Sequence, residues 1–157
     1  MAKTVNPAQL YKLHNEAPVK KKAPLKYSDK SVGQPALLYV FDELKKLMLP
    51  YVKGTIELQG GTGGQVSLIS KKPAELNGKN KSELLFAAAL IQKGYVGFYF
   101  MPVYALPEIK EVLKPELMKC LKGKSCFYIR QFDKEIFSQI KEAVKTGYQK
   151  YTEKGWV

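Results

Sequence analysis

Apolar side chains are densest near the middle of the chain, where two hydrophobic runs flank a short polar turn. Residues 84–91 are almost unbrokenly apolar, and residues 95–101 are rich in aromatic side chains, which favour pleated strands. Neither run would be stable in water, so the pattern predicts two central strands of a sheet joined by a turn at residues 92–94. Alternate residues of a strand share a face, so one face of the second strand should be buried. The side chains expected on that face are Val96, Phe98 and Phe100.

Two further stretches carry apolar residues at steps of three and four, the spacing of a helix with one buried face. The first begins at Pro35, which suits the first turn of a helix, and ends near Pro50. Its apolar stripe consists of Leu37, Phe41, Leu44 and Met48. The second follows Asp133, a residue type that caps helix N-termini. Its apolar stripe consists of Ile136, Ile140, Val144 and Tyr151. Trp156 is expected to fold back onto the domain as an aromatic anchor.

Three shorter runs have strand composition, namely residues 55–58, 66–69 and 125–130. Residues 73–82 are polar instead, and we expect them to form a connection with a turn at Asn77-Gly78. The sheet should therefore be built from the two central strands and these shorter ones.

Prolines divide the segment after the second central strand. Pro102 should end that strand, and short helices should begin at Pro107 and Pro115. Lys122 and Gly123 fit the C-terminus of the second short helix. The order of elements predicts the α+β class, with an antiparallel sheet packed by an N-terminal helix, short middle helices and a long C-terminal helix.

The N-terminal residues differ in composition from the rest of the chain. Residues 1–31 are rich in Pro and Lys and poor in bulky aliphatic residues, so they should not bury enough apolar area to offset the entropy of ordering. We expect a flexible basic arm over residues 1–31 and a single α+β domain over residues 32–157. The arm could be disordered alone, dock on a partner or dock on its own domain.

The N-terminus has no apolar segment typical of a signal peptide, and the longest apolar block is shorter than the ~20 residues of a membrane helix. The expected location is therefore the cytoplasm, with no membrane partner. Cys120 and Cys126 are the only cysteines, and we expect free thiols that pack as small apolar side chains.

The net charge of +12 is spread over the chain rather than confined to the arm. Such an excess favours anionic partners, nucleic acid among them. The candidate anion or nucleic-acid contacts are Lys122, Lys124, Lys141, Lys145 and Lys150. Arg130 is the only arginine, however, and specific phosphate and base contacts favour the planar fork of Arg. We therefore expect nucleic-acid binding to be weak and non-specific, or absent.

A glycine-rich stretch separates the strands predicted at residues 55–58 and 66–69. Its glycines are Gly60, Gly61, Gly63 and Gly64. Backbone N–H groups of such a loop can cradle a phosphate, which makes it a candidate ligand loop. A plain hairpin loop is the simpler interpretation, because no Lys-Ser/Thr pair follows and the next segment has strand composition rather than helical composition.

The sequence offers little chemistry for catalysis. The only histidine, His14, lies in the N-terminal arm, and no Ser-His-Asp arrangement, metal-ligand cluster or carboxylate pair is visible. Cys126 lies near Lys124 and could have a lowered pKa, but apolar neighbours on a strand favour burial. We therefore predict no catalytic residues, no metal ligands and no cofactor.

Several local patterns resemble the YdhG-like family of small bacterial domains, also called DUF1801. The resemblance lies in residues 85–90, in residues 96–102, in Gly123-Lys124-Ser125 before a strand, and in the closing helix after Asp133. Many members carry an aromatic-rich segment before the central strands, where this chain has Lys72-Pro73-Ala74-Glu75. The resemblance implies an α+β fold with helices on an antiparallel sheet, but no agreed activity.

Taken together, these patterns favour a non-catalytic module of a cytoplasmic bacterial protein that binds a small molecule or a protein. Some proteins related to the YdhG-like family have been compared with frataxin-like iron chaperones, so iron binding is one alternative. Acidic residues are sparse here, and the positive charge opposes cation capture. Weak, non-specific nucleic-acid binding is the other alternative.

Overall fold

The structure is a computed structural model that describes residues 28–157. Its helical elements are α2 (Pro35–Met48), η1 (Leu49–Tyr51), α3 (Met101–Ala105), η2 (Pro107–Glu111), α4 (Pro115–Met118) and α5 (Lys134–Glu153). Its strands are β1 (Ile56–Gly60), β2 (Gln65–Ser70), β3 (Ala74–Leu76), β4 (Lys79–Lys81), β5 (Leu84–Gln92), β6 (Tyr95–Phe100), β7 (Leu121–Lys122) and β8 (Cys126–Ile129). The chain thus has the α+β class that its sequence predicts.

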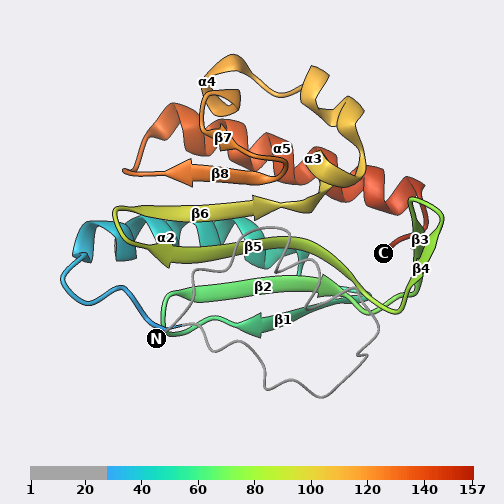
Figure 1. Ribbon diagram of the computed structural model, residues 1–157, viewed down its shortest axis with the longest axis horizontal. Coiled ribbons are helices and arrows are strands. Elements are labelled where there is room, and N and C mark those ends of the chain that lie inside the picture. The colour runs from blue at the N-terminus through green and yellow to red at the C-terminus, as the bar shows by residue number, and fades with distance from the viewer. Residues whose placement is uncertain (1–27) are drawn as a thin grey trace.

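Six strands form one antiparallel sheet in the order β1-β2-β5-β6-β8-β7 (Figure 1). The predicted central pair is confirmed, because β5 and β6 pair in register from Ala87 opposite Phe100 to Gln92 opposite Tyr95. All nine residues of β5 are buried. A strand buried on both faces needs packed atoms on both sides of the sheet.

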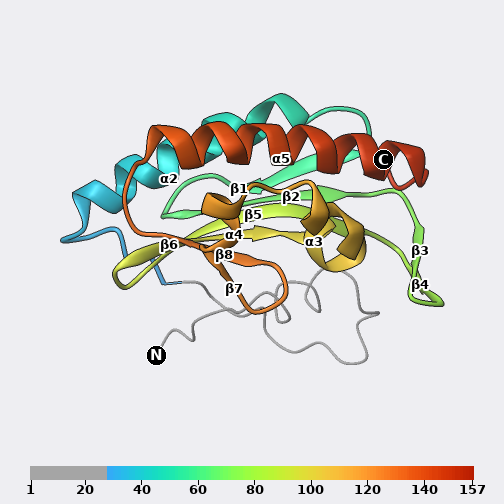
Figure 2. The ribbon, with the colours of Figure 1, turned by 90° about the horizontal axis from the view of Figure 1, so that it is seen from above.

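Helices α2 and α5 lie side by side on one face of the sheet (Figure 2). The predicted stripe of α2 is buried as expected, at Leu37, Phe41, Leu44 and Met48. The stripe of α5 faces the same core, with Ile140, Val144 and Tyr151 buried and Ile136 half-buried. Val96, Phe98 and Phe100 of β6 are each at most 1% exposed and pack in this core, which confirms their predicted common face.

A β-bulge adjusts β5 to this core. Leu68 of β2 pairs with Ala87, and its neighbour Ile69 pairs with Leu85, so Phe86 is an extra residue in β5. Such a residue shifts the alternation of the strand locally. Phe86 and Ala87 consequently both belong to the core beneath the helices.

The opposite face of the sheet carries a second group of buried residues, which we call the second-face cluster. It consists of Ile69, Leu85, Ala88, Leu90, Tyr99, Met101 and Cys126. Tyr104 and Tyr128 are half-buried and pack against it. None of these residues comes from α2 or α5, so the sheet has apolar packing on a face that the two long helices do not touch.

Three short elements differ from the sequence prediction. The polar connection at residues 73–82 is a hairpin of β3 and β4, although its turn lies at Asn77-Gly78 as predicted. Strand β6 ends at Phe100, and Pro102 lies in the first turn of helix α3 instead of a simple strand end. Lys122 is not at a helix C-terminus but in strand β7, because α4 already ends at Met118.

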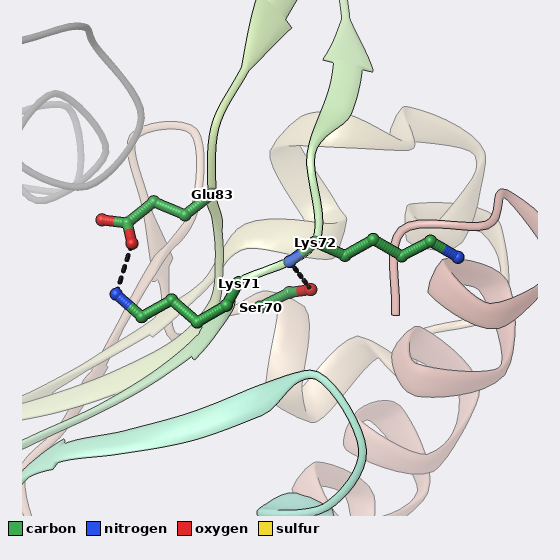
Figure 3. Close-up of polar contacts among 4 residues, drawn as sticks. All are labelled: Ser70, Lys71, Lys72 and Glu83. Carbon is green, nitrogen blue, oxygen red and sulfur yellow. Dashed lines mark hydrogen bonds and ion pairs between the residues drawn. The ribbon is translucent and has the colours of Figure 1, made fainter.

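Polar contacts hold the base of the β3–β4 hairpin. Figure 3 shows the ion pair between Lys71, before β3, and Glu83, after β4. In the same view, the backbone N–H of Lys72 donates to Ser70 Oγ at 3.4 Å. Ser70 in turn donates its hydroxyl to the backbone carbonyl of Trp156 at 2.6 Å, which ties the end of the chain to β2. Trp156 is 8% exposed, so the predicted aromatic anchor is confirmed.

Of the predicted flexible arm, only residues 28–31 are among those the structure describes. The arm's predicted flexibility therefore concerns residues outside those that the structure describes. None of the helices in residues 28–157 has the length and apolar character needed to span a membrane.

Helix α5 packs tightly against Phe100 and Pro102 at Gly147. A Cβ atom placed there would lie 2.4 Å from Phe100 Cζ and 2.9 Å from Pro102 Cγ. Real Cβ atoms do not approach other atoms so closely, so any larger side chain would push α5 away from the sheet. The glycine therefore sets the distance between α5 and the end of β6.

We predict that Gly147→Ala lowers the free energy of unfolding by roughly 1–3 kcal/mol, because overpacking costs more than Ala gains in helix propensity. Urea denaturation of the full chain measures the change. Gln149→Ala, at an exposed position of the same helix, is the matched control and should leave the midpoint unchanged or slightly higher. A midpoint for Gly147→Ala equal to that of the control would contradict the close approach.

Candidate functional site

A pocket of about 300 Å³ lies at the edge of the sheet formed by β7, next to the N-terminus of α5. Its lining residues are Lys119, Cys120, Lys122, Tyr128, Ile129, Arg130, Gln131, Asp133 and Ile136. We call it the cationic pocket, because three of these side chains carry a positive charge. The remaining walls are mostly apolar or uncharged, as is usual in small-molecule sites.

The β7–β8 hairpin builds one side of the cationic pocket. Lys122 pairs with Cys126 in the register of the hairpin. The backbone N–H of Tyr128 donates to the carbonyl of Cys120 at 2.8 Å, which extends the pairing by one step. Cys120 and Lys122 are two residues apart on this extended edge, and both line the pocket.

The segment between β8 and α5 builds the other side. Arg130 directly follows Ile129, the last residue of β8, and the chain then turns into α5 at Asp133. Asp133 Oδ1 accepts a hydrogen bond from the backbone N–H of Ile136 at 3.0 Å, which confirms its predicted role as the helix cap. The carboxylate of Asp133 is therefore already engaged by α5.

The positive charges of the pocket are not neutralised by ion pairs. Among residues 28–157, no ion pair involves Lys119, Lys122 or Arg130. The N-terminus of α5, a helix of 20 residues, adds the positive end of its dipole beside them. Asp133 is the one acidic residue that lines the pocket, and the carboxylate of Glu116 acts electrostatically on Lys119 from outside the lining. The pocket therefore has an electrostatic preference for an anion.

Cys120 is the nucleophilic side chain in the cationic pocket. Burial raises its pKa, the nearby Lys122 acts in the opposite direction, and Asp133 raises it further. Its thiol lies 3.7 Å from the carbonyl oxygen of Glu116, to which it donates. A thiol whose pKa is raised stays protonated at neutral pH, and the protonated form is a poor nucleophile.

The five lysines predicted as anion contacts do not form one site. Lys122 lines the cationic pocket, whereas Lys124 lies 5.6 Å from the ring centroid of Tyr104. Lys141 and Lys145 are exposed on α5, and Lys150 pairs with Glu153 at 3.4 Å. None of the lysines on α5 lines the pocket.

Two cationic residues of the pocket, Lys119 and Arg130, are missing from the set of predicted contacts. The sequence pattern predicts a helix end near residues 119–123, which separates these residues from the strand that carries Arg130. The signal that would have found them is the short Gly123-Lys124 turn between two strands. A hairpin there runs the residues before Lys122 back along β8, toward the end that is followed by Arg130.

The glycine-rich loop lies at the opposite edge of the sheet, between β1 and β2. The N–H of Gly61 donates to the carbonyl of Gln65 at 2.6 Å, and the carbonyl of Gly64 accepts from Ile91 at 2.9 Å. Lys45 Nζ donates to the carbonyl of Gly61 at 2.7 Å. These backbone groups close a hairpin and join it to β5 and α2, as a plain hairpin loop would.

Gly60, Gly61, Gly63 and Gly64 all have positive φ. A Cβ at Gly60 would also lie 2.9 Å from the carbonyl oxygen of Gln65. The hairpin geometry thus explains why this loop needs glycine. The role of the loop in ligand binding remains a prediction.

Cys126 belongs to the second-face cluster and is 2% exposed. Burial raises its pKa to about 12, and a hydrogen bond with Tyr99 lowers it only in part. Burial of this thiol is therefore confirmed, and the proximity of Lys124 in sequence does not activate it. Both cysteines are free thiols, as expected.

Residues 28–157 contain no group of three or more His, Cys, Asp or Glu side chains placed to hold a metal ion. His14 lies outside the described residues. No protein-family model, curated protein or solved structure matches this chain. The resemblance to the YdhG-like family therefore stays a prediction from the sequence.

Substitutions of Asp133 can distinguish its role as the cap of α5 from the effect of its negative charge. We predict that Asp133→Ala lowers the free energy of unfolding by about 1 kcal/mol, because it removes the acceptor for the Ile136 N–H. Asp133→Asn keeps an acceptor and should cost much less. Urea denaturation of both variants tests this. Equal losses for Ala and Asn would mean that the negative charge, and not the hydrogen bond, stabilises the start of α5.

Proposed function

We propose that this protein is a non-catalytic binding module that holds a small anionic molecule in the cationic pocket. The observation that carries the proposal is the convergence of Lys119, Lys122 and Arg130 on one cavity, where none of the three forms an ion pair with a described residue. Three neighbouring positive charges repel one another, and an anion that enters the pocket removes this repulsion.

The size and lining of the cavity define the class of ligand. A volume of about 300 Å³ lies at the lower end of small-molecule sites. Arg130 offers a planar fork that binds a carboxylate or phosphate through two parallel hydrogen bonds, and the lysines add point charges. Ile129, Ile136 and Tyr128 offer apolar contact to the rest of the ligand. The pocket suits a small carboxylate or a phosphate monoester.

We also propose that the protein has no catalytic activity. The support for this is the state of Cys120, because burial raises the pKa of the one thiol in the pocket and so removes a thiolate nucleophile at neutral pH. We also propose a cytoplasmic location, which the two free thiols support, since reduced cysteines are usual there. Membership of the YdhG-like family is a further proposal that rests on the sequence patterns alone.

Weak, non-specific nucleic-acid binding is the second candidate. The exposed Lys141 and Lys145 lie one turn apart on α5, and the net charge is +12. Binding of this kind fades steeply between ~50 and ~200 mM salt, because counterion release drives it.

Calorimetric titration of the full chain with inorganic phosphate and with citrate tests the proposed function. We expect saturable binding of at least one of the two anions with one site. Arg130→Gln and Lys122→Gln should each weaken that binding about tenfold, which corresponds to about 1.4 kcal/mol. Lys141→Gln removes the same charge on α5 and is the matched control, which should bind like the parent.

Two results would contradict the proposal. One is the absence of saturable binding for both anions. The other is an equal loss of affinity in Lys141→Gln, because it would show that the overall charge and not the pocket binds the anion. An oligonucleotide that binds the parent but loses affinity in Lys141→Gln, with no pocket binding of phosphate or citrate, would favour the second candidate.

A further inference from the structure

The cationic pocket has more room than its anion needs. Its volume of about 300 Å³ is far larger than the roughly 30 Å³ that one water molecule occupies in the liquid. Lys119, Lys122 and Arg130 can hold a phosphate or carboxylate group, but such a group alone would leave most of the cavity unfilled. The remaining walls should therefore contact the part of the ligand that carries the anion.

Among the described residues that line the pocket, Tyr128 is the aromatic one. Its ring is stacked on that of Tyr95, with the centroids 4.0 Å apart and 11° between the ring planes. Burial raises the pKa of Tyr95, and a hydrogen bond with Tyr128 raises it further, so the two side chains are also joined at their hydroxyls. A ring held by stacking and by a hydrogen bond is preorganised to receive a flat group on its other face.

That other face of the Tyr128 ring lies toward β7. In the sheet order β6-β8-β7, Tyr95 of β6 is on one side of Tyr128, so the opposite side is that of β7 (Figure 1). The residue opposite Tyr128 there is Cys120, because the N–H of Tyr128 donates to the Cys120 carbonyl at 2.8 Å. The side chain of Cys120 has a single heavy atom beyond Cβ, so it leaves space over the ring. Both residues line the pocket, which makes this space part of the cavity.

The charge of Arg130 lies next to the aromatic pair. Val96 pairs with Ile129, Tyr95 precedes Val96, and Arg130 follows Ile129. Tyr95 and Arg130 are therefore neighbours across the antiparallel pair of β6 and β8. Although burial raises the pKa of Tyr95, the charge of Arg130 acts in the opposite direction, as this proximity requires. A ligand whose anion binds Arg130 can thus place an attached ring over Tyr128.

We propose that the ligand of the cationic pocket is a nucleoside monophosphate, with its phosphate on Arg130 and the lysines and its base on Tyr128, a proposal that rests on the proposed function. Every nucleobase has a flat π face, and stacking on an aromatic side chain tolerates any base. Gln131 also lines the pocket, and its amide can donate to and accept from the polar edge of a base or the sugar hydroxyls. This amide favours a nucleobase over a hydrocarbon ring.

Calorimetric titration of the full chain with AMP and with ribose 5-phosphate separates the ring from the anion. The two probes carry the same phosphate ester, and only AMP has a base. We expect AMP to bind at least about fivefold more tightly, because a stacked base adds affinity. Tyr128→Leu keeps an apolar side chain without a ring, so the ratio of the two affinities should fall to about one. Tyr128→Phe restores the ring and should recover the ratio.

A second variant tests the space over the ring and leaves Tyr128 in place. Cys120→Leu puts a larger side chain beside that ring face, so it should weaken the binding of AMP more than that of inorganic phosphate. The matched control is Tyr39→Leu, which removes an exposed tyrosine of α2 that does not line the pocket. It should keep the parent's ratio of affinities.

Each outcome decides the proposal. Equal affinities of the parent for AMP and ribose 5-phosphate would overturn it and leave the anion site intact. No binding of AMP, ribose 5-phosphate or inorganic phosphate would overturn the proposed function as well. A ratio that persists in Tyr128→Leu, or in Cys120→Leu where Tyr128→Leu does not fold, would also overturn it. Loss of the ratio in Tyr39→Leu would do the same, because the ring pair of Tyr39 and Phe132 would then be the stacking surface.

Discussion

Strand β5 is buried along its whole length, and the rest of the fold provides packed atoms for both of its faces. Each fully buried Leu or Ile side chain contributes about 1.5–3 kcal/mol relative to an exposed one, so this strand is a large part of the driving force for folding. Helices α2 and α5 cover one face, and the bulge at Phe86 directs an additional ring into that core. Gly147 then allows α5 to approach Phe100 closely enough to exclude water.

Long elements could be predicted from the sequence because their periodicity is strong. The stripes of α2 and α5 and the alternation in β6 each depend on several residues of one element. The short elements β3, β4, β7 and α3 could not be predicted in this way. Each of them is defined by a pairing or packing partner elsewhere in the chain or by a single turn. Strand β7, for example, has two residues and exists through its pairing with β8.

The same reasoning explains why most residues of the cationic pocket could not be predicted from the sequence. Charge alone singled out five lysines, but only Lys122 among them lines the cationic pocket. The pocket depends on the hairpin register that brings Lys122 beside β8 and on the turn that places Arg130 before α5. Three-dimensional convergence of this kind leaves no periodic signal in the sequence, and it depends on elements too short to predict.

The cationic pocket and the second face of the sheet share one residue. Tyr128 lines the pocket, and its ring also stacks on Tyr95 with a centroid distance of 4.0 Å. The pair extends the second face from β6 onto β8, next to the buried Cys126. The edge of the sheet that holds the proposed ligand is thus continuous with the second face of the sheet.

Native-state hydrogen exchange of the full chain tests most directly whether burial of β5 on both faces is the constraint that organises the fold. Amides that exchange only through global unfolding report the full free energy of unfolding. The account predicts that the amides of Ala88 and Leu90 belong to this slowest class and respond to urea with the slope of global unfolding. Exchange of these amides through local fluctuations, at a lower free energy than the amides of Ile140 and Val144 in α5, would contradict it.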